Sequence, residues 1–182
     1  MRARTFFDPT FVRVERRRST VLAALLLWSV VSFLFISRFV LSAAEVEGDS
    51  MYPALCDGNR YLLNRWIYRF YDPQPGDIVA VQVPRYEDLS VKRIVASPGD
   101  KVQIKNGWVR VNGRRLEEPY LPAGVITTPG PLATASYRVD PGCYFVLGDN
   151  RSGSLDSRYF GAVRREWIIG RVAVSGHLKA GF

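Results

Sequence analysis

The chain has 182 residues, a length that favours one globular domain with an appended segment over several domains. Its net charge is +8, and this basic excess alone does not distinguish nucleic acid, an anionic membrane and acidic proteins as partners. Two cysteines, Cys56 and Cys143, and one histidine, His177, argue against a structural metal cluster, because zinc sites of that kind take about four His or Cys ligands.

The first element in chain order is a long apolar segment. The 19 residues from Ser19 to Ser37 carry no charge, and a helix rising about 1.5 Å per residue would nearly cross the ~30 Å hydrocarbon core of a bilayer. Basic residues precede it: Arg2, Arg4, Arg13, Arg16, Arg17 and Arg18. By the positive-inside rule, the N-terminus is then cytoplasmic. We predict a basic cytoplasmic segment over 1–18, a transmembrane signal anchor over 19–44 and an extracytoplasmic domain over 45–182.

A cleavable secretory signal is the alternative interpretation, because Ser42-Ala43-Ala44 resembles a cleavage site. The apolar region is unusually long for such a signal, so an uncleaved anchor is favoured, and self-cleavage at Ala44 stays open. The extracytoplasmic side of a membrane would permit a disulfide between Cys56 and Cys143, while two buried free thiols fit the sequence equally well.

Strand and turn signals dominate after residue 44. Asp-Gly, Pro-Gly and Asn-Gly pairs separate short runs rich in Val, Ile, Tyr and Trp, and Asn106-Gly107 indicates a two-residue hairpin. A Pro- and Gly-rich stretch from Glu118 to Ser136 predicts a long surface connection. The predicted strands are Ile78–Val83, Val91–Ala96, Val102–Lys105, Trp108–Val111, Tyr144–Leu147 and Ile168–Val174. The fold class is therefore all-β, a domain of antiparallel sheets preceded by one transmembrane helix.

The chain offers few candidates for a catalytic base. The only histidine, His177, lies near the C-terminus, so a serine hydrolase here would need another base, and a buried lysine with a populated neutral amine can serve. Lys92 is the candidate, because a period of two puts it on the strand face shared with Ile94 and Ala96, with Arg93 on the other face. A solvent-facing lysine that protects an edge strand is the alternative.

Ser50 is the candidate nucleophile. It lies six residues beyond the end of the predicted anchor, between Gly48-Asp49 and Met51-Tyr52-Pro53, where it could meet membrane-embedded substrates. An exposed turn serine is the alternative interpretation.

Three segments together resemble the type I signal peptidase family (S26), whose catalysis uses a Ser/Lys dyad. Their order after an apolar anchor is also that of the family, and the resemblance extends to about Arg171. The segments are Ser50-Met51-Tyr52-Pro53-Ala54-Leu55, Lys92-Arg93-Ile94-Val95-Ala96-Ser97-Pro98-Gly99-Asp100, and Gly148-Asp149-Asn150-Arg151 through Ser154-Leu155-Asp156-Ser157-Arg158.

The resemblance implies a membrane-bound serine endopeptidase with a signal-peptidase-like β domain that removes signal peptides from exported preproteins. Ser50 would attack the scissile carbonyl, and Lys92 would take its proton and later protonate the leaving amine, by way of an acyl-enzyme. The implied partners are signal-peptide-bearing preproteins and the lipid bilayer of the cytoplasmic membrane, with a monomeric enzyme, no nucleic acid and no metal or organic cofactor.

Further residues match the family by position. Ser154 matches a serine that hydrogen-bonds the catalytic lysine, and Asp156 and Arg158 match a supporting ion pair. The family's oxyanion hole uses the N–H of the nucleophile and, in some members, a hydroxyl two residues earlier; Gly48 stands there in this chain, so a nearby backbone donor would have to substitute. The positions matching shallow pockets for small residues, one and three places before the cut, are Val46, Met51, Leu55 and Val91.

Three other functions compete with this one. A conjugative-transfer maturation peptidase shares the Ser/Lys chemistry, although Ser50-Met51-Tyr52-Pro53 favours a general signal peptidase. A soluble self-cleaving repressor-type protease has a related dyad, but the apolar segment and the lack of a helix-turn-helix pattern argue against it. A catalytically silent, membrane-tethered scaffold would not need Ser50, Lys92 and Ser154 together.

Overall fold

The computed structural model describes residues 9–35, 41–45, 47–58, 60–84, 89–132 and 136–173. They form two compact units that divide between Val40 and Leu41. Predictions that fall on Val46 or His177 lie outside the described residues.

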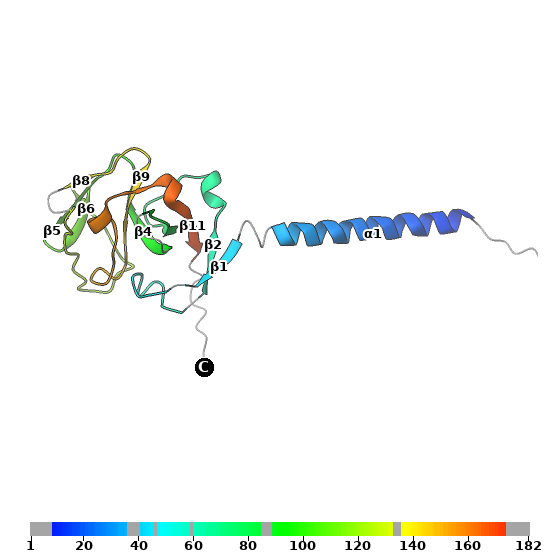
Figure 1. Cartoon of the computed structure of the whole chain (residues 1–182), viewed down its shortest axis with the longest axis horizontal. Helices are drawn as coiled ribbons and strands as arrows, with labels where there is room; N and C mark the ends of the chain where they lie inside the picture. Colours follow the sequence, from blue (N-terminus) through cyan, green and yellow to red (C-terminus); the bar gives the residue numbers. More distant parts are fainter. Residues whose placement is uncertain are drawn as a thin grey trace, which may run out of the picture. The chain divides into compact units, whose positions relative to one another are not determined.

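The first unit contains one helix, α1, over Pro9–Phe35 (Figure 1). Proline suits a first helical position because its missing N–H needs no partner there, and no Gly or Pro interrupts the rest of the helix. Its described apolar side chains, from Val21 onward, are exposed, for example Leu26 at 69% and Trp28 at 74%.

The part of the chain that the structure describes holds no helix meeting the length and hydropathy needed to cross a membrane. A helix does precede the strands, as predicted, but it begins at Pro9, and the transmembrane character predicted over 19–44 is not found in the described residues. Residues 41–44, predicted to end the anchor, form strand β1 (Leu41–Glu45) together with Glu45, because their backbone pairs with Arg60–Asn64.

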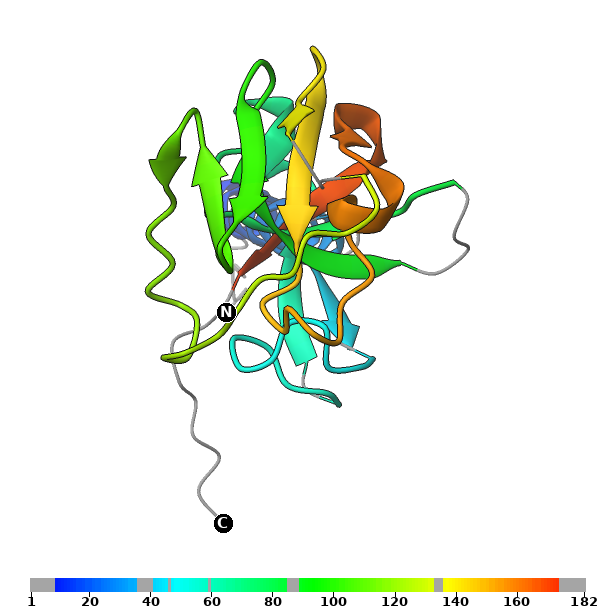
Figure 2. The same cartoon turned by 90° about the vertical axis from the view of Figure 1, so that its left-hand side faces the viewer.

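The second unit consists mainly of antiparallel strands in two sheets, which confirms the predicted class of fold (Figures 1 and 2). The larger sheet has seven strands in the order β1-β2-β11-β3-β4-β9-β10. Besides β1, its strands are β2 Arg60–Asn64, β3 Ile78–Val81, β4 Ser90–Ala96, β9 Cys143–Leu147, β10 Val163–Arg164 and β11 Ile168–Ala173.

The smaller sheet has four strands in the order β7-β6-β5-β8. These are β5 Lys101–Lys105, β6 Trp108–Val111, β7 Arg114–Arg115 and β8 Tyr137–Arg138. Short helices complete the unit: η2 Ile67–Arg69, α2 Ser157–Phe160 and η3 Arg165–Trp167.

The apolar core falls into three clusters. One lies on β3, β4 and β9 and includes Val79, Ile94 and Val146. A second joins the two sheets through side chains such as Val102 and Phe145. The third buries Met51, Leu55, Leu63, Ile78, Ala80 and Val172. The third cluster fixes the turn after Ser50 against the larger sheet, because Met51 and Leu55 are both fully buried.

All six predicted strands are present, with every described boundary within two residues of its prediction; the predicted end at Val174 lies outside the described residues. The Asn106-Gly107 hairpin is also confirmed: the two residues have φ of 54° and 81°, and Lys105 pairs with Trp108. Two positive φ angles are characteristic of the tightest hairpin turn, which Asn-Gly adopts readily.

The predicted sharing of one strand face by Lys92, Ile94 and Ala96 is partly wrong. The register of β4 against β9 shifts between Ile94 and Ala96, as at a β-bulge. An extra residue at such a point reverses the alternation beyond it. Consequently, Ile94 belongs to the first core cluster, whereas Ala96 belongs to the second together with Val95.

Neither cysteine is in a disulfide. Cys56 and Cys143 are both free thiols, and both are half-buried. Of the two possibilities that the sequence left open, the structure therefore has the free thiols, although they are less deeply buried than expected.

Candidate active site

Ser50 lies in a turn that the chain on both sides holds firmly. Tyr52 N–H donates to the carbonyl of Asp49, and Leu55 N–H donates to that of Met51. The Ser50 carbonyl accepts a hydrogen bond from Asn150 N–H at 3.1 Å, so the Gly-Asp-Asn segment contacts the serine segment directly. The Ser50 side chain is left partly exposed.

The backbone around Ser50 bears on the predicted oxyanion hole. Gly48, with φ of 88°, donates its N–H to Asp57 Oδ1 at 2.7 Å, so this donor is already engaged. The N–H of Ser50 itself has no acceptor among the described residues.

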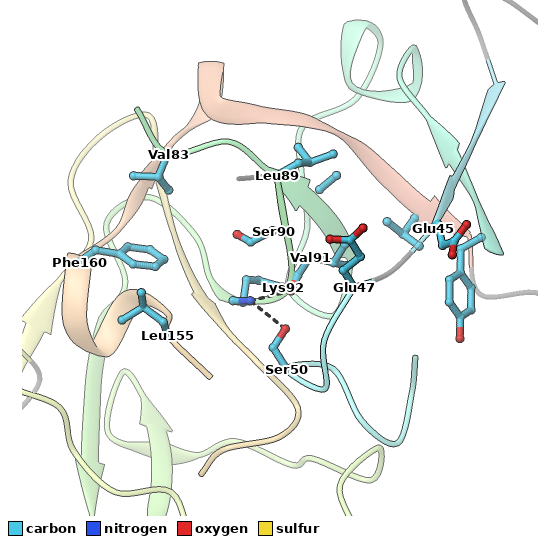
Figure 3. A pocket seen from close by; sticks show the side chains of 13 residues that line it. Glu45, Glu47, Ser50, Val83, Leu89, Ser90, Val91, Lys92, Leu155 and Phe160 are labelled. Carbon is cyan, nitrogen blue, oxygen red and sulfur yellow. Dashed lines mark hydrogen bonds between the residues drawn. The ribbon is translucent and has the colours of Figure 1, made fainter. Parts of the chain in front are cut away.

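Lys92 lies on β4 opposite Val79 of β3, and only 3% of it is exposed. Its Nζ lies 3.0 Å from Ser50 Oγ and 3.0 Å from the carbonyl of Val91 (Figure 3). Burial lowers the pKa of Lys92, and the negative charge of Asp156 opposes this shift. A buried lysine beside a serine hydroxyl is an arrangement in which a neutral amine can accept the hydroxyl proton.

Ser154 is buried behind this pair. Its hydroxyl has no hydrogen-bond partner within the described part of the chain, so the bond to Lys92 implied by the family resemblance is not present in this structure. Ser154 packs against Gly148 so closely that a Cβ added at Gly148 would lie 2.2 Å from Ser154 Oγ. That Cβ would also lie 2.5 Å from the Ser50 carbonyl oxygen, so Gly148 packs against both Ser50 and Ser154.

Asp156 and Arg158 form a buried ion pair. Arg158 donates through Nε to Asp156 Oδ1 and through Nη2 to Oδ2, each at 2.8 Å. Asp156 also caps α2 by accepting the N–H of Arg158, and its Oδ2 accepts the N–H of Gly148 at 3.0 Å. This pair therefore ties α2 to the end of β9, next to Ser154.

A cavity of about 320 Å³ opens over Ser50 and Lys92 (Figure 3). Its remaining walls are mostly apolar, with two carboxylates: Glu45, Glu47, Tyr61, Ala80, Val83, Leu89, Ser90, Val91, Leu155, Phe160 and Val172. Of the predicted pocket residues, Val91 lines the cavity. Met51 and Leu55 are fully buried in the cluster that also contains Ala80 and Val172, and Val46 lies outside the described residues.

Two buried ion pairs were not among the predicted site residues. Arg93 is bound to Asp149 by Nε at 2.9 Å and Nη2 at 2.6 Å. Arg151 is paired with Glu118 and is 3% exposed. Charged residues are usually exposed, so their residue types did not predict burial. Arg93, Asp149 and Arg151 lie in the lysine and Gly-Asp-Asn segments, which was the available signal, whereas nothing in the sequence marked Glu118.

No group of three His, Cys, Asp or Glu side chains within the described ranges is arranged to hold a metal ion. The described polar groups of the cavity are the hydroxyls, carboxylates and amine named above.

The family model described as signal peptidase, peptidase S26, matches residues 17–176. The chain is similar to the signal peptidase I of Bacillus caldolyticus, with 41% identity over 143 residues, 74% of this chain and 78% of the relative. It is 37% identical over 152 residues to the probable signal peptidase I-2 of a Synechocystis strain, covering 80% of this chain and 67% of the relative. A solved signal peptidase I structure from Enterococcus faecalis has 32% identity and a TM-score of 0.49, covering 57% of this chain and 98% of that one.

Proposed function

The chain belongs to the signal peptidase family S26, serine endopeptidases that cleave signal peptides from preproteins, and we propose that Ser50 and Lys92 are its nucleophile and general base. The observation that carries the proposal is the 3.0 Å contact between Lys92 Nζ and Ser50 Oγ on the floor of the cavity. These residues are 42 positions apart in sequence, so the fold is needed to bring them together.

The buried lysine suits the role of base. Because burial lowers its pKa, a larger fraction of the amine is neutral at a given pH than for an exposed lysine. The neutral amine accepts the Ser50 proton while Oγ attacks the scissile carbonyl, and the ammonium then protonates the leaving amine. The resulting acyl-enzyme is hydrolysed when the same amine takes a proton from water.

In this mechanism the oxyanion accepts a hydrogen bond from the backbone N–H of Ser50. That N–H has no acceptor among the described residues. The N–H of Gly48 is less suited to the task because the Asp57 carboxylate already accepts it. Ser154, Asp156 and Arg158 would act as supports: the ion pair fixes α2, and the Ser154 hydroxyl, which has no partner among the described residues, is available to orient the amine.

The substrate would be a preprotein whose residues one and three before the cut are small. The apolar walls formed by Val91, Ala80 and Val172 support this preference. Met51 and Leu55 would act from beneath the walls, because they pack in one cluster with Ala80 and Val172. Val46 completes the proposed pocket set.

We propose, in addition, that the segment within 19–44 anchors a monomeric enzyme in the cytoplasmic membrane, with the N-terminus cytoplasmic and 45–182 on the extracytoplasmic face. The 19 uncharged residues from Ser19 to Ser37 and the arginines before them support this arrangement. An active site close after the anchor would meet signal peptides at the membrane surface.

The test of the dyad is cleavage of a preprotein with an Ala-x-Ala site in detergent, with the cut mapped by mass spectrometry. We expect Ser50→Ala and Lys92→Ala to lower kcat by at least about 10²- to 10⁴-fold, because each removes a group from the chemical step. Ser136→Ala and Lys101→Ala, both at exposed positions, are the matched controls and should retain activity. Normal cleavage by folded Ser50→Ala or Lys92→Ala enzyme would contradict the mechanism.

A further inference from the structure

The connection from Glu118 to Ser136 is far from Ser50 and Lys92 in sequence, but it contacts the segments that form their site. The stretch from Glu118 to Ser136, expected to be a surface connection, is exposed at many positions, but Thr127 is only 2% exposed and Glu118 has an 8% exposed side chain. Tyr120 is half-buried. Buried polar side chains in such a segment need partners, and these partners lie in the active-site segments.

Glu118 is the first of these anchoring points. Its carboxylate accepts Nη2 of Arg151 in a buried ion pair and the hydroxyl of Tyr120 at 3.0 Å. Arg151 also donates Nη1 to Thr127 Oγ1 at 2.6 Å and Nε to the Gly148 carbonyl at 3.0 Å. Through Arg151, the connection is therefore hydrogen-bonded to the main chain of the Gly-Asp-Asn loop.

Tyr120 is the second. Its ring covers Arg93, whose guanidinium carbon lies 3.9 Å from the ring centre. Arg93 follows Lys92 on β4 and holds Asp149 through two hydrogen bonds, while its Nη1 donates to the Gly76 carbonyl at 3.0 Å. The connection thus contacts both Arg151, which binds Gly148, and Arg93, which binds Asp149.

The loop held in this way contacts Ser50. Asn150 N–H donates to the Ser50 carbonyl at 3.1 Å, and Gly148 lies against both that carbonyl and Ser154. A shift of the loop would therefore move the main chain of Ser50 or open space beside Ser154 and Lys92.

We propose that Glu118 and Tyr120 are positioning residues for the reaction of Ser50 and Lys92, acting through Arg151 and Arg93 on the loop 148–154. The inference rests on the function proposed above. Removing one partner of a buried ion pair leaves the other charge buried without a counter-charge. The loop then relaxes until water or another polar group can solvate that charge. Ser50 Oγ and Lys92 Nζ then lose the relative positions that the reaction requires to within less than about 1 Å.

Loosening the loop also changes the surroundings of the Lys92 amine. The described charged groups near it are Asp156, paired with Arg158, and the carboxylates Glu45 and Glu47, which line the same cavity. Water admitted beside the amine stabilises the ammonium and raises the pKa of Lys92 toward that of an exposed lysine. Since the neutral amine is the active form, the acidic limb of the pH profile of kcat/KM would move to higher pH.

The test compares Tyr120→Phe, which removes only the bond to Glu118, with Glu118→Gln, which removes the charge. We expect kcat to fall by about tenfold to 10²-fold with KM nearly unchanged, and the acidic limb to move to higher pH, more in Glu118→Gln than in Tyr120→Phe. Glu117→Gln, at the exposed neighbouring position, and Tyr71→Phe, at a residue 70% exposed, are the matched controls and should behave as wild type.

Two outcomes would overturn the positioning role. One is a lower melting temperature in both variants with kcat and the pH profile unchanged, because that is the effect of a purely structural contact. The other comes from competitive acetylation of Lys92 across pH, read by mass spectrometry on the full chain without substrate: an unchanged titration of the amine in both variants rejects the proposal. Since acetylation needs no turnover, it decides the question even if the wild type leaves the preprotein uncut, a result that would reject the proposed function instead.

Discussion

Gly148 is the residue on which the site's packing depends most directly. Any Cβ there would lie 2.2 Å from Ser154 Oγ and 2.5 Å from the Ser50 carbonyl oxygen, and the second of these is main chain. We expect Gly148→Ala to push the loop away from Ser50 and lower kcat by roughly 10²-fold, as measured by preprotein cleavage. Gly153→Ala is the control in the same loop, because its nearest neighbour is the flexible end of the Asn150 side chain, and equal losses in both variants would contradict the explanation.

Lys92 should destabilise the fold in a way that depends on pH. Burial lowers its pKa below the ordinary value of 10.5, so between the lowered pKa and 10.5 the unfolded chain binds more protons than the folded chain. Stability therefore rises with pH over that window. We expect Lys92→Met to be more stable than wild type near pH 7, with a difference that shrinks as the pH approaches 10.5. Urea unfolding of both proteins across this range measures it, and parallel pH dependences would refute the idea.

Among the elements, α2 depends on a buried ion pair. It has only four residues, and Asp156 both caps it and pairs with Arg158, with each of the two residues at most 1% exposed. We expect Asp156→Ala to cost about 3–5 kcal/mol of unfolding free energy, because the buried Arg158 keeps its bonds to two backbone carbonyls but loses its counter-charge. Asp156→Ala with Arg158→Met should recover part of that loss. A double mutant that is as unstable as the sum of the single variants would show that the two charges do not interact energetically.

The elements also show what the sequence could and could not predict. Core strands such as β3 and β9 were predicted because Val, Ile, Tyr and Phe mark them clearly. Strand β2 was missed, since Arg60-Tyr61-Leu62-Leu63-Asn64 lacks β-branched residues and an alternating pattern. Strand β1 was hidden at the end of an apolar run, and only its pairing with β2 reveals it.

The candidate site divides in the same way. Ser50 and Lys92 were identified through a family resemblance, because their spacing along the chain carries no sign of their contact. Arg151 and Glu118 are 33 residues apart, and each looks like a solvated surface charge in sequence. Long-range pairs of this kind depend on the tertiary arrangement of loops, which local patterns do not encode.

For the whole molecule, the proposed anchor predicts firm attachment to membranes. We expect the full chain to stay in the membrane fraction after alkaline carbonate extraction, because the uncharged segment would lie in hydrocarbon. Arg substitutions at Leu26 and Val30 should release it, since each costs about 2.5–3.5 kcal/mol at the centre of a membrane helix. Extraction of the wild-type chain by carbonate would argue against the anchor.

The outer strands of the larger sheet have a further consequence for how the second unit could be rewired. Ala43 of β1 and Ala173 of β11 both pair with Leu62, on opposite sides of β2. Both strands run antiparallel to β2 and therefore parallel to each other, so a linker from the end of β11 must cross β2 and run back to Leu41 at the start of β1, which takes about a dozen residues. With new termini opened at the exposed Asn112-Gly113 turn, a circularly permuted domain would present Ser154 before Ser50 and Lys92 along the chain while leaving their contacts as they are.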